Sequence, residues 1–506
     1  MNVGQLSLDN LERFGEYTSL YFGEREISNK ERLEAAAALA SVLEERGVGV
    51  DDKVVVMMPN SPEVTAAFQA AWKLGAVIVP VTPQLGVPEV SYMLEDSGAK
   101  TLITSPLLAP LVCEAASGKS CEVLVLGASE APGATDISAE LEAAAGALPI
   151  DHLTPRSADD LALLLYTSGT TGQPKGVMLT HGNLSSNAHS VVQMATDTEP
   201  MERSLAVLPL SHSYGVIVMN AGYLLGGVTV LMPFFKLDEV FENLQKFQIQ
   251  QFSVVPTMLN YMLNFPERHK YDLSDLKKVG SGGAALPNEI RLAFEKEFDC
   301  EVKEGYGMSE CAPSATGYLP DEAYRPGSVG RAIPGVSISI RDGQNQELPA
   351  HTTGEICIQG PNVMHGYWNK EEATREALEG GWLHSGDVGH MDEDGFVFIT
   401  DRKKDLIIKG AENISPREIE EAIYHHPGVA EVAVIGLPDE TYGETVAAAV
   451  HLREGAEATE DEIRAQAAEF VTKFKVPTHV FFTGDLPKSG NGKILKRELR
   501  EQFTKS

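Results

Sequence analysis

The stretch Tyr166-Thr-Ser-Gly-Thr-Thr-Gly-Gln-Pro-Lys-Gly176 says more about this chain than any other. It follows the apolar run 161–165 and combines aliphatic hydroxyls, three glycines and Lys175. A buried strand that opens into such a loop is suited to holding phosphate. Glycine lets the backbone approach the anion, and N–H groups, hydroxyls and a cation supply donors. The spacing does not match a Walker A loop, in which Gly, four residues, Gly, Lys and Ser or Thr follow one another. The stretch therefore predicts a nucleotide-phosphate loop of another kind.

Composition places the chain among globular proteins. Its 506 residues are 43% apolar and 22% charged, enough for several domains with a large core. The net charge of −31 is a poor match for nucleic acid or an anionic membrane. We therefore expect a small-molecule enzyme and no nucleic-acid partner.

The five cysteines show neither paired nor metal-ligand spacing, which favours reduced thiols and a cytoplasmic protein. Residues 1–13 lack the basic and apolar regions of a secretory signal. The most membrane-like stretch, 216–234, is interrupted by Asn220, three glycines and Pro233. We interpret it as a helix and a strand of the core, so no transmembrane segment is expected.

Apolar runs and helical patterns alternate through the first 400 residues. Strands are expected at 54–58 and 76–81, with a helix at 62–74 between them, and the rhythm returns at 101–103 and 123–126. This order predicts an α/β fold, a large N-terminal domain of mixed or parallel sheets layered with helices.

The pattern changes near residue 400. A short strand at 396–400 is followed by five consecutive charges from Asp401 to Asp405, which we interpret as a solvated loop and hinge. From residue 403 onward, 14 Lys and Arg nearly balance 18 Asp and Glu. A helix, a strand at 432–435 and a helix at 460–470 are expected in this part. The prediction is a large domain at 1–401 and a small mobile α+β domain at 402–506, with the hinge near 402–405.

Three further segments are suited to a nucleotide. The small residues of 279–285 allow a flat ring to approach the backbone. The segment 305–310 offers an aromatic face, a hydroxyl and a carboxylate. The segment 384–387 presents a carboxylate after a glycine turn, as a ribose diol requires. Each is a common pattern alone, and their order behind the phosphate loop is what favours a nucleotide site.

With these motifs, the chain resembles the adenylate-forming superfamily of acyl-CoA synthetases, luciferases and adenylation domains over essentially its whole length. The matching segments are the phosphate loop 167–176, the motif 306–310, the ribose motif 385–387, the hinge motif 401–410 and the C-terminal lysine motif 487–493. Ser309 stands where the family usually has Thr, and the hydroxyl is retained.

The resemblance implies ATP, Mg²⁺ and coenzyme A as cofactors, and the following roles. The phosphates are held by Thr167, Ser168, Gly169, Thr170, Thr171, Gly172 and Lys175. Adenine is enclosed by Gly282, Gly283, Ala284 and Tyr306, and Gly307 and Ser309 belong to the same cofactor-binding set. The ribose is bound by Asp387 and Arg402, and Mg²⁺ is bound by Glu310 with Thr167. Lys493 reaches the acyl carboxylate and the α-phosphate, where a lysine and a metal stabilise the crowded transition state. The predicted catalytic set is Lys493, Thr167, Lys175, Glu310 and His212.

For the second half-reaction, the resemblance implies that the small domain turns about the hinge. Lys404 falls at the hinge position of the family, and Gly410 and Glu412 fall where the family lines the pantetheine channel. Short glycine turns can absorb such a rotation.

The sequence says less about which carboxylic acid is the substrate. Residues 208–222 contain no acidic side chain to pair an ammonium group, which disfavours an amino acid substrate. We expect an acyl-CoA ligase for a medium- or long-chain fatty acid. The alternatives are an aryl acid ligase of the coumarate or benzoate type, an acyl-AMP ligase that loads a carrier protein, and a binding protein that has lost catalysis. A monomer or homodimer is expected.

Overall fold

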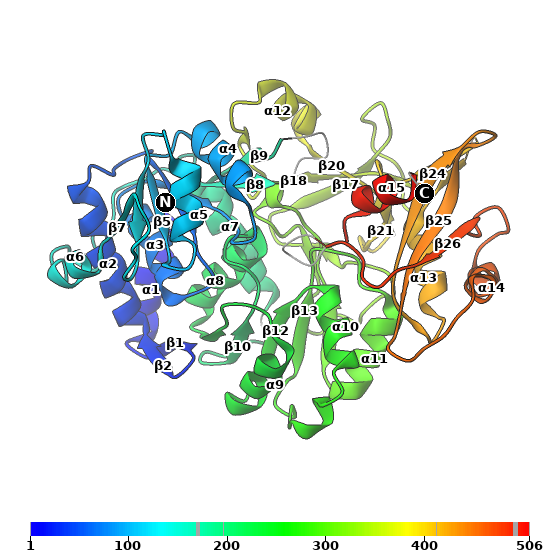
Figure 1. The fold of residues 1–506 in the computed structure, drawn as a ribbon, viewed down its shortest axis with the longest axis horizontal. Helices are drawn as coiled ribbons and strands as arrows, with labels where there is room; N and C mark the ends of the chain where they lie inside the picture. The colour runs from blue at the N-terminus through cyan, green and yellow to red at the C-terminus, as the bar shows by residue number, and fades with distance from the viewer. Residues whose placement is uncertain (1, 168–172, 196, 411, 489–493, 505–506) are drawn as a thin grey trace.

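The computed structural model describes residues 2–167, 173–195, 197–410, 412–488 and 494–504 (Figure 1). Two sheets of mostly parallel strands form the large part of the molecule. In spatial order, one contains β19 (Gly366–Tyr367), β9 (Lys175–Thr180), β8 (Leu161–Thr167), β4 (Val77–Pro80), β3 (Lys53–Met57), β5 (Thr101–Thr104), β6 (Glu122–Val125) and β7 (Ala134–Asp136). The other contains β14 (Glu301–Glu304), β13 (Lys278–Ser281), β12 (Gln251–Val254), β10 (Arg203–Ala206), β11 (Val228–Leu231), β1 (Thr18–Phe22) and β2 (Arg25–Ser28).

Helices cover these sheets, because strands such as β3 are apolar and buried on both faces. They are α1 (Gln5–Phe14), α2 (Asn29–Glu45), α3 (Pro62–Lys73), α4 (Val87–Ser97), α5 (Ala109–Ala116), α6 (Ser138–Ala143), α7 (His181–Met194), α8 (Ser213–Leu225), α9 (Leu237–Lys246), α10 (Pro256–Asn264), α11 (Asn288–Phe298) and α12 (Glu371–Ala377), with short 3-10 turns η1 (Arg268–Lys270), η2 (Ser309–Cys311) and η3 (Glu379–Gly381). Capping boxes at Ser28 and Thr180 start α2 and α7. The predicted strand, helix and strand of 54–81 are confirmed as β3, α3 and β4.

An antiparallel sheet follows, made of β17 (Ser337–Arg341), β18 (Gly354–Gln359), β20 (Leu383–Met391) and β21 (Val397–Arg402), together with the pair β15 (Thr316–Gly317) and β16 (Arg331–Ala332). The ends of β20 and β21 border the candidate site described below.

Residues from 407 onward form a smaller domain with cores of its own, drawn in orange and red in Figure 1. Its sheet contains β23 (Glu412–Ile414), β22 (Ile407–Lys409), β25 (Gly443–Leu452) and β24 (Val429–Asp439), with β26 (His479–Phe482) beside β25, and its helices are α13 (Pro416–Tyr424), α14 (Glu460–Phe470) and α15 (Lys496–Thr504). The predicted α/β fold with a large and a small domain is confirmed.

The charged run 401–405 is less exposed than its composition suggested. Asp401 and Arg402 belong to β21, and Asp401 is buried. Its carboxylate accepts hydrogen bonds from Ser415 Oγ (2.9 Å) and from the Arg417 N–H (3.0 Å) at the start of α13. Asp401 therefore caps the first helix of the small domain from the end of β21, while Lys403 and Lys404 lie in an exposed turn. The boundary near 402–405 stays a prediction.

Across the described ranges, no helix combines the length and the apolar character that a membrane crossing requires.

Candidate active site

A cavity of about 720 Å³ lies where both large sheets, the antiparallel sheet and the small domain meet. Thr167 and Lys175 reach it from β8 and β9, and Glu310 reaches it from η2. Lys488 and Leu495 border it from the small domain. A neighbouring cavity of about 250 Å³ shares Tyr306 and Arg402 with the first, so the two form one region around these side chains. Side chains of both charges thus line one region.

The described ends of the phosphate loop are held by a strand pair. Thr167 and Lys175 are register partners in the antiparallel pairing of β8 with β9, which brings both ends of the loop to the same edge. Lys175 Nζ lies 4.9 Å from the centre of the Tyr367 ring, a cation–π distance. The loop residues 168–172 lie outside the described residues.

Glu310 is held by the same tyrosine. Its side chain is almost wholly buried, and its Oε1 accepts a hydrogen bond of 2.8 Å from Tyr367 Oη. Burial and the charge of Glu310 raise the pKa of Tyr367, so the phenol stays a donor. One tyrosine therefore contacts both the lysine of the phosphate loop and the carboxylate.

A second tyrosine and carboxylate lie on the other side. Tyr306 Oη donates to Asp387 Oδ2 at 2.7 Å, and Arg402 Nε lies 3.1 Å from Asp387 Oδ1. Burial and the nearby Asp387 charge raise the pKa of Tyr306 well above its usual value. The next residue must be glycine, since a Cβ at Gly307 would lie 1.8 Å from the Pro313 carbonyl oxygen. The result is an aromatic ring beside a buried carboxylate and a guanidinium, which suits a nucleoside.

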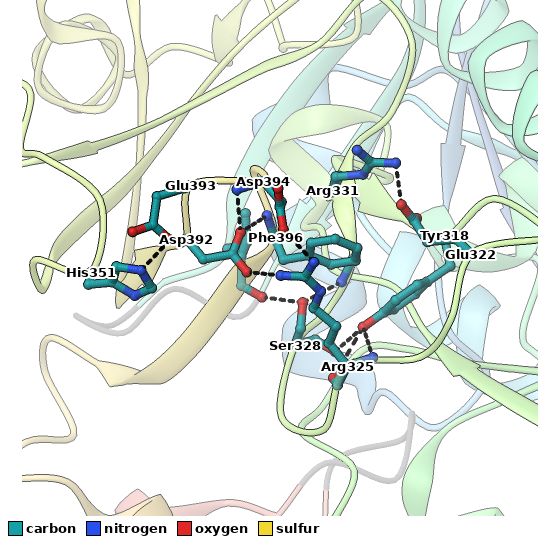
Figure 2. A network of polar contacts seen from close by, with 12 residues as sticks. Tyr318, Glu322, Arg325, Ser328, Arg331, His351, Asp392, Glu393, Asp394 and Phe396 are labelled. Atoms are coloured by element: carbon teal, nitrogen blue, oxygen red, sulfur yellow. Dashed lines mark hydrogen bonds and ion pairs between the residues drawn. The ribbon is translucent and has the colours of Figure 1, made fainter.

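A network of polar contacts surrounds Arg325, as Figure 2 shows. Arg325 pairs with Asp392 and with Asp394 and lies over the Phe396 ring at 4.0 Å. Ser328 Oγ donates to the Val397 carbonyl at 2.9 Å. The loop that follows β15 is thereby fixed to the start of β21, the strand that ends at Arg402.

Comparison with known families decides the assignment. A model described as "AMP-binding enzyme" matches residues 8–368, and a model described as "AMP-binding enzyme C-terminal domain" matches residues 418–493. The chain belongs to the AMP-binding enzyme family.

Relatives of this AMP-binding enzyme are CoA ligases. A long-chain-fatty-acid–CoA ligase of Bacillus subtilis (strain 168) is 36% identical, over 98% of this chain and 94% of that protein. A feruloyl-CoA synthase of Amycolatopsis sp is 37% identical, over 96% of each. The crystal structure of ATP-bound MatB from Rhodopseudomonas palustris superposes with a TM-score of 0.90 at 31% identity, covering 100% of this chain and 99% of that one. The prediction of an adenylate-forming acyl-CoA ligase is confirmed at the level of the family.

Most of the predicted site residues of this AMP-binding enzyme come together around the two cavities. Those that line them are Thr167, Lys175, His212, Gly282, Gly283, Ala284, Tyr306, Gly307, Ser309, Glu310, Asp387 and Arg402. Ser168, Gly169, Thr170, Thr171, Gly172 and Lys493 lie outside the described residues. Lys404 follows β21, Gly410 follows β22 and Glu412 begins β23, and none of the three is among the residues that line the two cavities. The roles of all these residues stay predictions.

Backbone pairing joins residues before and after Lys493. The Leu495 N–H donates to the Pro487 carbonyl at 2.8 Å, and Lys488 forms an antiparallel bridge with Ile494. These two paired ends of the segment 487–495 stand at the cavity, because Lys488 and Leu495 line it.

Sequence reasoning missed two tyrosines. Tyr367 contacts Lys175 and Glu310. The Tyr214 ring packs against Gly282, where an added Cβ would lie 3.2 Å from the ring. Burial raises the pKa of Tyr214 to about 12. The sequence offered as signals only an aromatic pair after Gly366 and an aromatic residue after His212. Neither pattern reveals a partner 57 or more residues away.

Proposed function

We propose that this AMP-binding enzyme is an ATP-dependent acid–thiol ligase. A carboxylate oxygen attacks the α-phosphorus of ATP, pyrophosphate leaves, and the acyl-adenylate then passes its acyl group to the thiol of coenzyme A with release of AMP. The observation that carries the proposal is the single cavity that joins Lys175, Glu310 and the residues flanking the Lys493 motif. Adenylation needs these groups together, because two anions must meet and the new charge must be stabilised.

Residues at different positions around the cavity hold different parts of the substrates. Thr167 and Lys175 hold the departing pyrophosphate at the ends of β8 and β9. Asp387 accepts hydrogen bonds from the ribose hydroxyls. Tyr306 and the small residues 282–284 enclose adenine. Lys493 is proposed to pair with the carboxylate and the α-phosphate. His212, at the cavity wall before α8, is proposed to lie beside the carboxylate.

The side chains around the cavity can bind Mg²⁺ only if the substrate phosphates supply further ligands. In the part of the chain that the structure describes, no cluster of three or more His, Cys, Asp or Glu side chains could hold a metal. Glu310 is a single buried carboxylate beside the cavity, and Mg²⁺ is commonly held by one or two carboxylates with phosphates and water. We propose Glu310, with Thr167, as the protein ligands. The bound ion would neutralise phosphate charge.

The proposed acid is a medium- or long-chain fatty acid. The cavity continues between apolar side chains, among them Val207, Phe234, Val255 and Met258. The likeness to a long-chain-fatty-acid–CoA ligase supports this choice. An aryl acid is the second candidate, supported by the feruloyl-CoA synthase relative and by the partly buried ring of Tyr214 in the same wall.

An acid-panel assay tests the function. AMP release is followed with ATP and fatty, aryl, amino and short-chain acids, each with and without coenzyme A. We expect release with a fatty acid that depends on coenzyme A for turnover. Preference for aryl acids would select the second candidate, and transfer only to a carrier protein would select an acyl-AMP ligase. Absence of pyrophosphate exchange with every acid would overturn the proposal.

We further propose the division at residues 402–405, with Lys404 at the hinge and Gly410 and Glu412 beside the pantetheine arm. Support comes from β21 ending at Arg402 and from the separate cores that begin at Ile407. All five cysteines are free thiols, which agrees with the expected cytoplasmic location. That location and the monomer or homodimer stay predictions.

A further inference from the structure

Helix α10 of the large domain is one of the places where side-chain hydrogen bonds join the small domain to the large one. Asn260 Nδ2 donates to the Ala430 carbonyl in β24 at 2.9 Å, and Asn260 is buried. Asn264, one turn later, pairs with Arg453. In Figure 1, α10 and its neighbour α11 lie on the side of the large domain that faces α13. Specific polar contacts thus join the small domain to this short helix.

Lys488 lies at the centre of this contact. Its Nζ donates to Tyr261 Oη in α10 at 2.7 Å and to Glu431 Oε2 in β24 at 2.7 Å. Burial opposes the charge of Lys488, but the hydrogen bonds with Glu431 and Tyr261 outweigh it and raise the pKa of the lysine. We call Tyr261, Lys488 and Glu431 the Lys488 cluster.

Glu431 depends on this lysine. Its side chain is only 4% exposed, and within the described residues Lys488 is the only cation that an ion pair joins to it. Leaving a buried carboxylate without its cation is costly, so Glu431 fixes Lys488 where it stands. Tyr261, by contrast, is 38% exposed and adds the one hydrogen bond in the cluster that crosses to the large domain.

The cluster also sets the position of the segment that carries the proposed catalytic lysine. Lys488 is bridged to Ile494, and the Leu495 N–H bonds to the Pro487 carbonyl. Both ends of the segment are therefore tied to Glu431 and, through Tyr261, to α10. Any rotation of the small domain about residues 402–405 must break the bond from Lys488 to Tyr261.

We propose that the Lys488 cluster positions the small domain for adenylation and that its bond to Tyr261 is made in that half-reaction only. The inference rests on the proposed two-step function. A purely structural role would lower both half-reactions together. A positioning role lowers only the one in which the segment 487–495 borders the cavity.

The test separates the two half-reactions in the full-length chain. Tyr261→Phe removes one hydroxyl and leaves the Lys488–Glu431 pair in place. We expect the kcat of pyrophosphate exchange to fall about tenfold, the value of a hydrogen bond to a charged group. The KM for the acid should stay within about twofold, and thioester formation from supplied acyl-adenylate should be unchanged or faster.

Two controls match this variant. Tyr271→Phe makes the same change near α10, at a tyrosine whose hydroxyl has no interdomain hydrogen bond among the described contacts. Glu418→Gln breaks the ion pair with Lys475, which lies within the small domain. Both should keep the wild-type ratio of the two half-reactions. Glu431→Gln, which removes the charge that holds Lys488, should change the ratio in the same direction as Tyr261→Phe.

Equal loss of both half-reactions in Tyr261→Phe, an unchanged ratio, or a rise confined to the KM for the acid would overturn the inference. No pyrophosphate exchange in the wild-type chain with any acid would instead overturn the proposed function, and this inference with it.

Discussion

The two walls of the cavity are built in different ways. On the large-domain wall, the side chains of Glu310, Tyr367 and Asp387 are fixed by strand pairings and by one another. On the small-domain wall, Lys488 and Leu495 are held at the cavity by a few side-chain contacts with α10. We infer from this difference that the proposed nucleotide site is built into a rigid frame. The segment that carries the proposed catalytic lysine has its ends held by contacts that can be broken singly.

The largest effect is expected from the small-domain wall. Lys493→Ala should lower adenylation by roughly a thousandfold or more, about 4 kcal/mol of transition-state stabilisation. Thioester formation from supplied acyl-adenylate should be spared. Pyrophosphate exchange and single-turnover thioester assays measure the two steps, with the exposed Lys473→Ala as control. Equal loss of both steps would mean that the two walls are not separable.

The next effect concerns the large-domain wall. Asp387→Asn removes a buried charge that accepts from Tyr306 and pairs with Arg402. We expect ATP binding to weaken by about 1.5 to 3 kcal/mol, the range for hydrogen bonds to a charged group. Calorimetric titration of ATP measures it, with the exposed Asp485→Asn as control. Unchanged ATP affinity would remove Asp387 from the nucleotide site.

The stability of the core behind the large-domain wall should fall at acid pH. His181 follows β9, is fully buried and accepts a hydrogen bond from the Val3 N–H at 3.0 Å. Burial, with the Arg156 charge, lowers its pKa to about 4. Because the unfolded imidazole takes up a proton near pH 6.5, its contribution to stability is present above that pH and is lost as the pH falls towards 4. The free energy of unfolding should drop by about 2 kcal/mol between pH 7 and pH 5.

Urea unfolding at the two pH values measures this loss. His181→Asn keeps an acceptor for the Val3 N–H and removes the titration, so its stability should change less over the same interval. The same fall in the variant would show that another group is responsible.

The smallest effect is expected at the tyrosine that joins two parts of the large-domain wall. Tyr367→Phe keeps the ring beside Lys175 and removes the hydroxyl that donates to Glu310. Loss of about 1 kcal/mol should raise the Mg²⁺ concentration needed for half-maximal exchange about fivefold. A magnesium titration of pyrophosphate exchange measures it. An unchanged midpoint would show that Tyr367 does not position Glu310.

Whether a contact or an element could be predicted from the sequence depends on how far apart its residues lie along the chain. The strands and helix of 54–81 could be predicted, because apolar runs and helical spacing are local. The charged run 401–405 was interpreted as a solvated loop, since the sequence does not show that Ser415 and the Arg417 N–H satisfy Asp401. Tyr367 was missed for the same reason, because its partner Glu310 lies 57 residues away.

The sequence by itself determined the reaction class. The loop 166–176 and the ordered motifs behind it require a phosphate loop, a ribose carboxylate and a terminal lysine, whatever their exact positions. Only the tertiary structure decided which groups meet: Tyr367 between Lys175 and Glu310, and Lys488 between Tyr261 and Glu431. The physical reason is that backbone conformation follows from neighbouring residues, whereas a hydrogen bond between distant segments exists only after the sheets and the small domain have packed together.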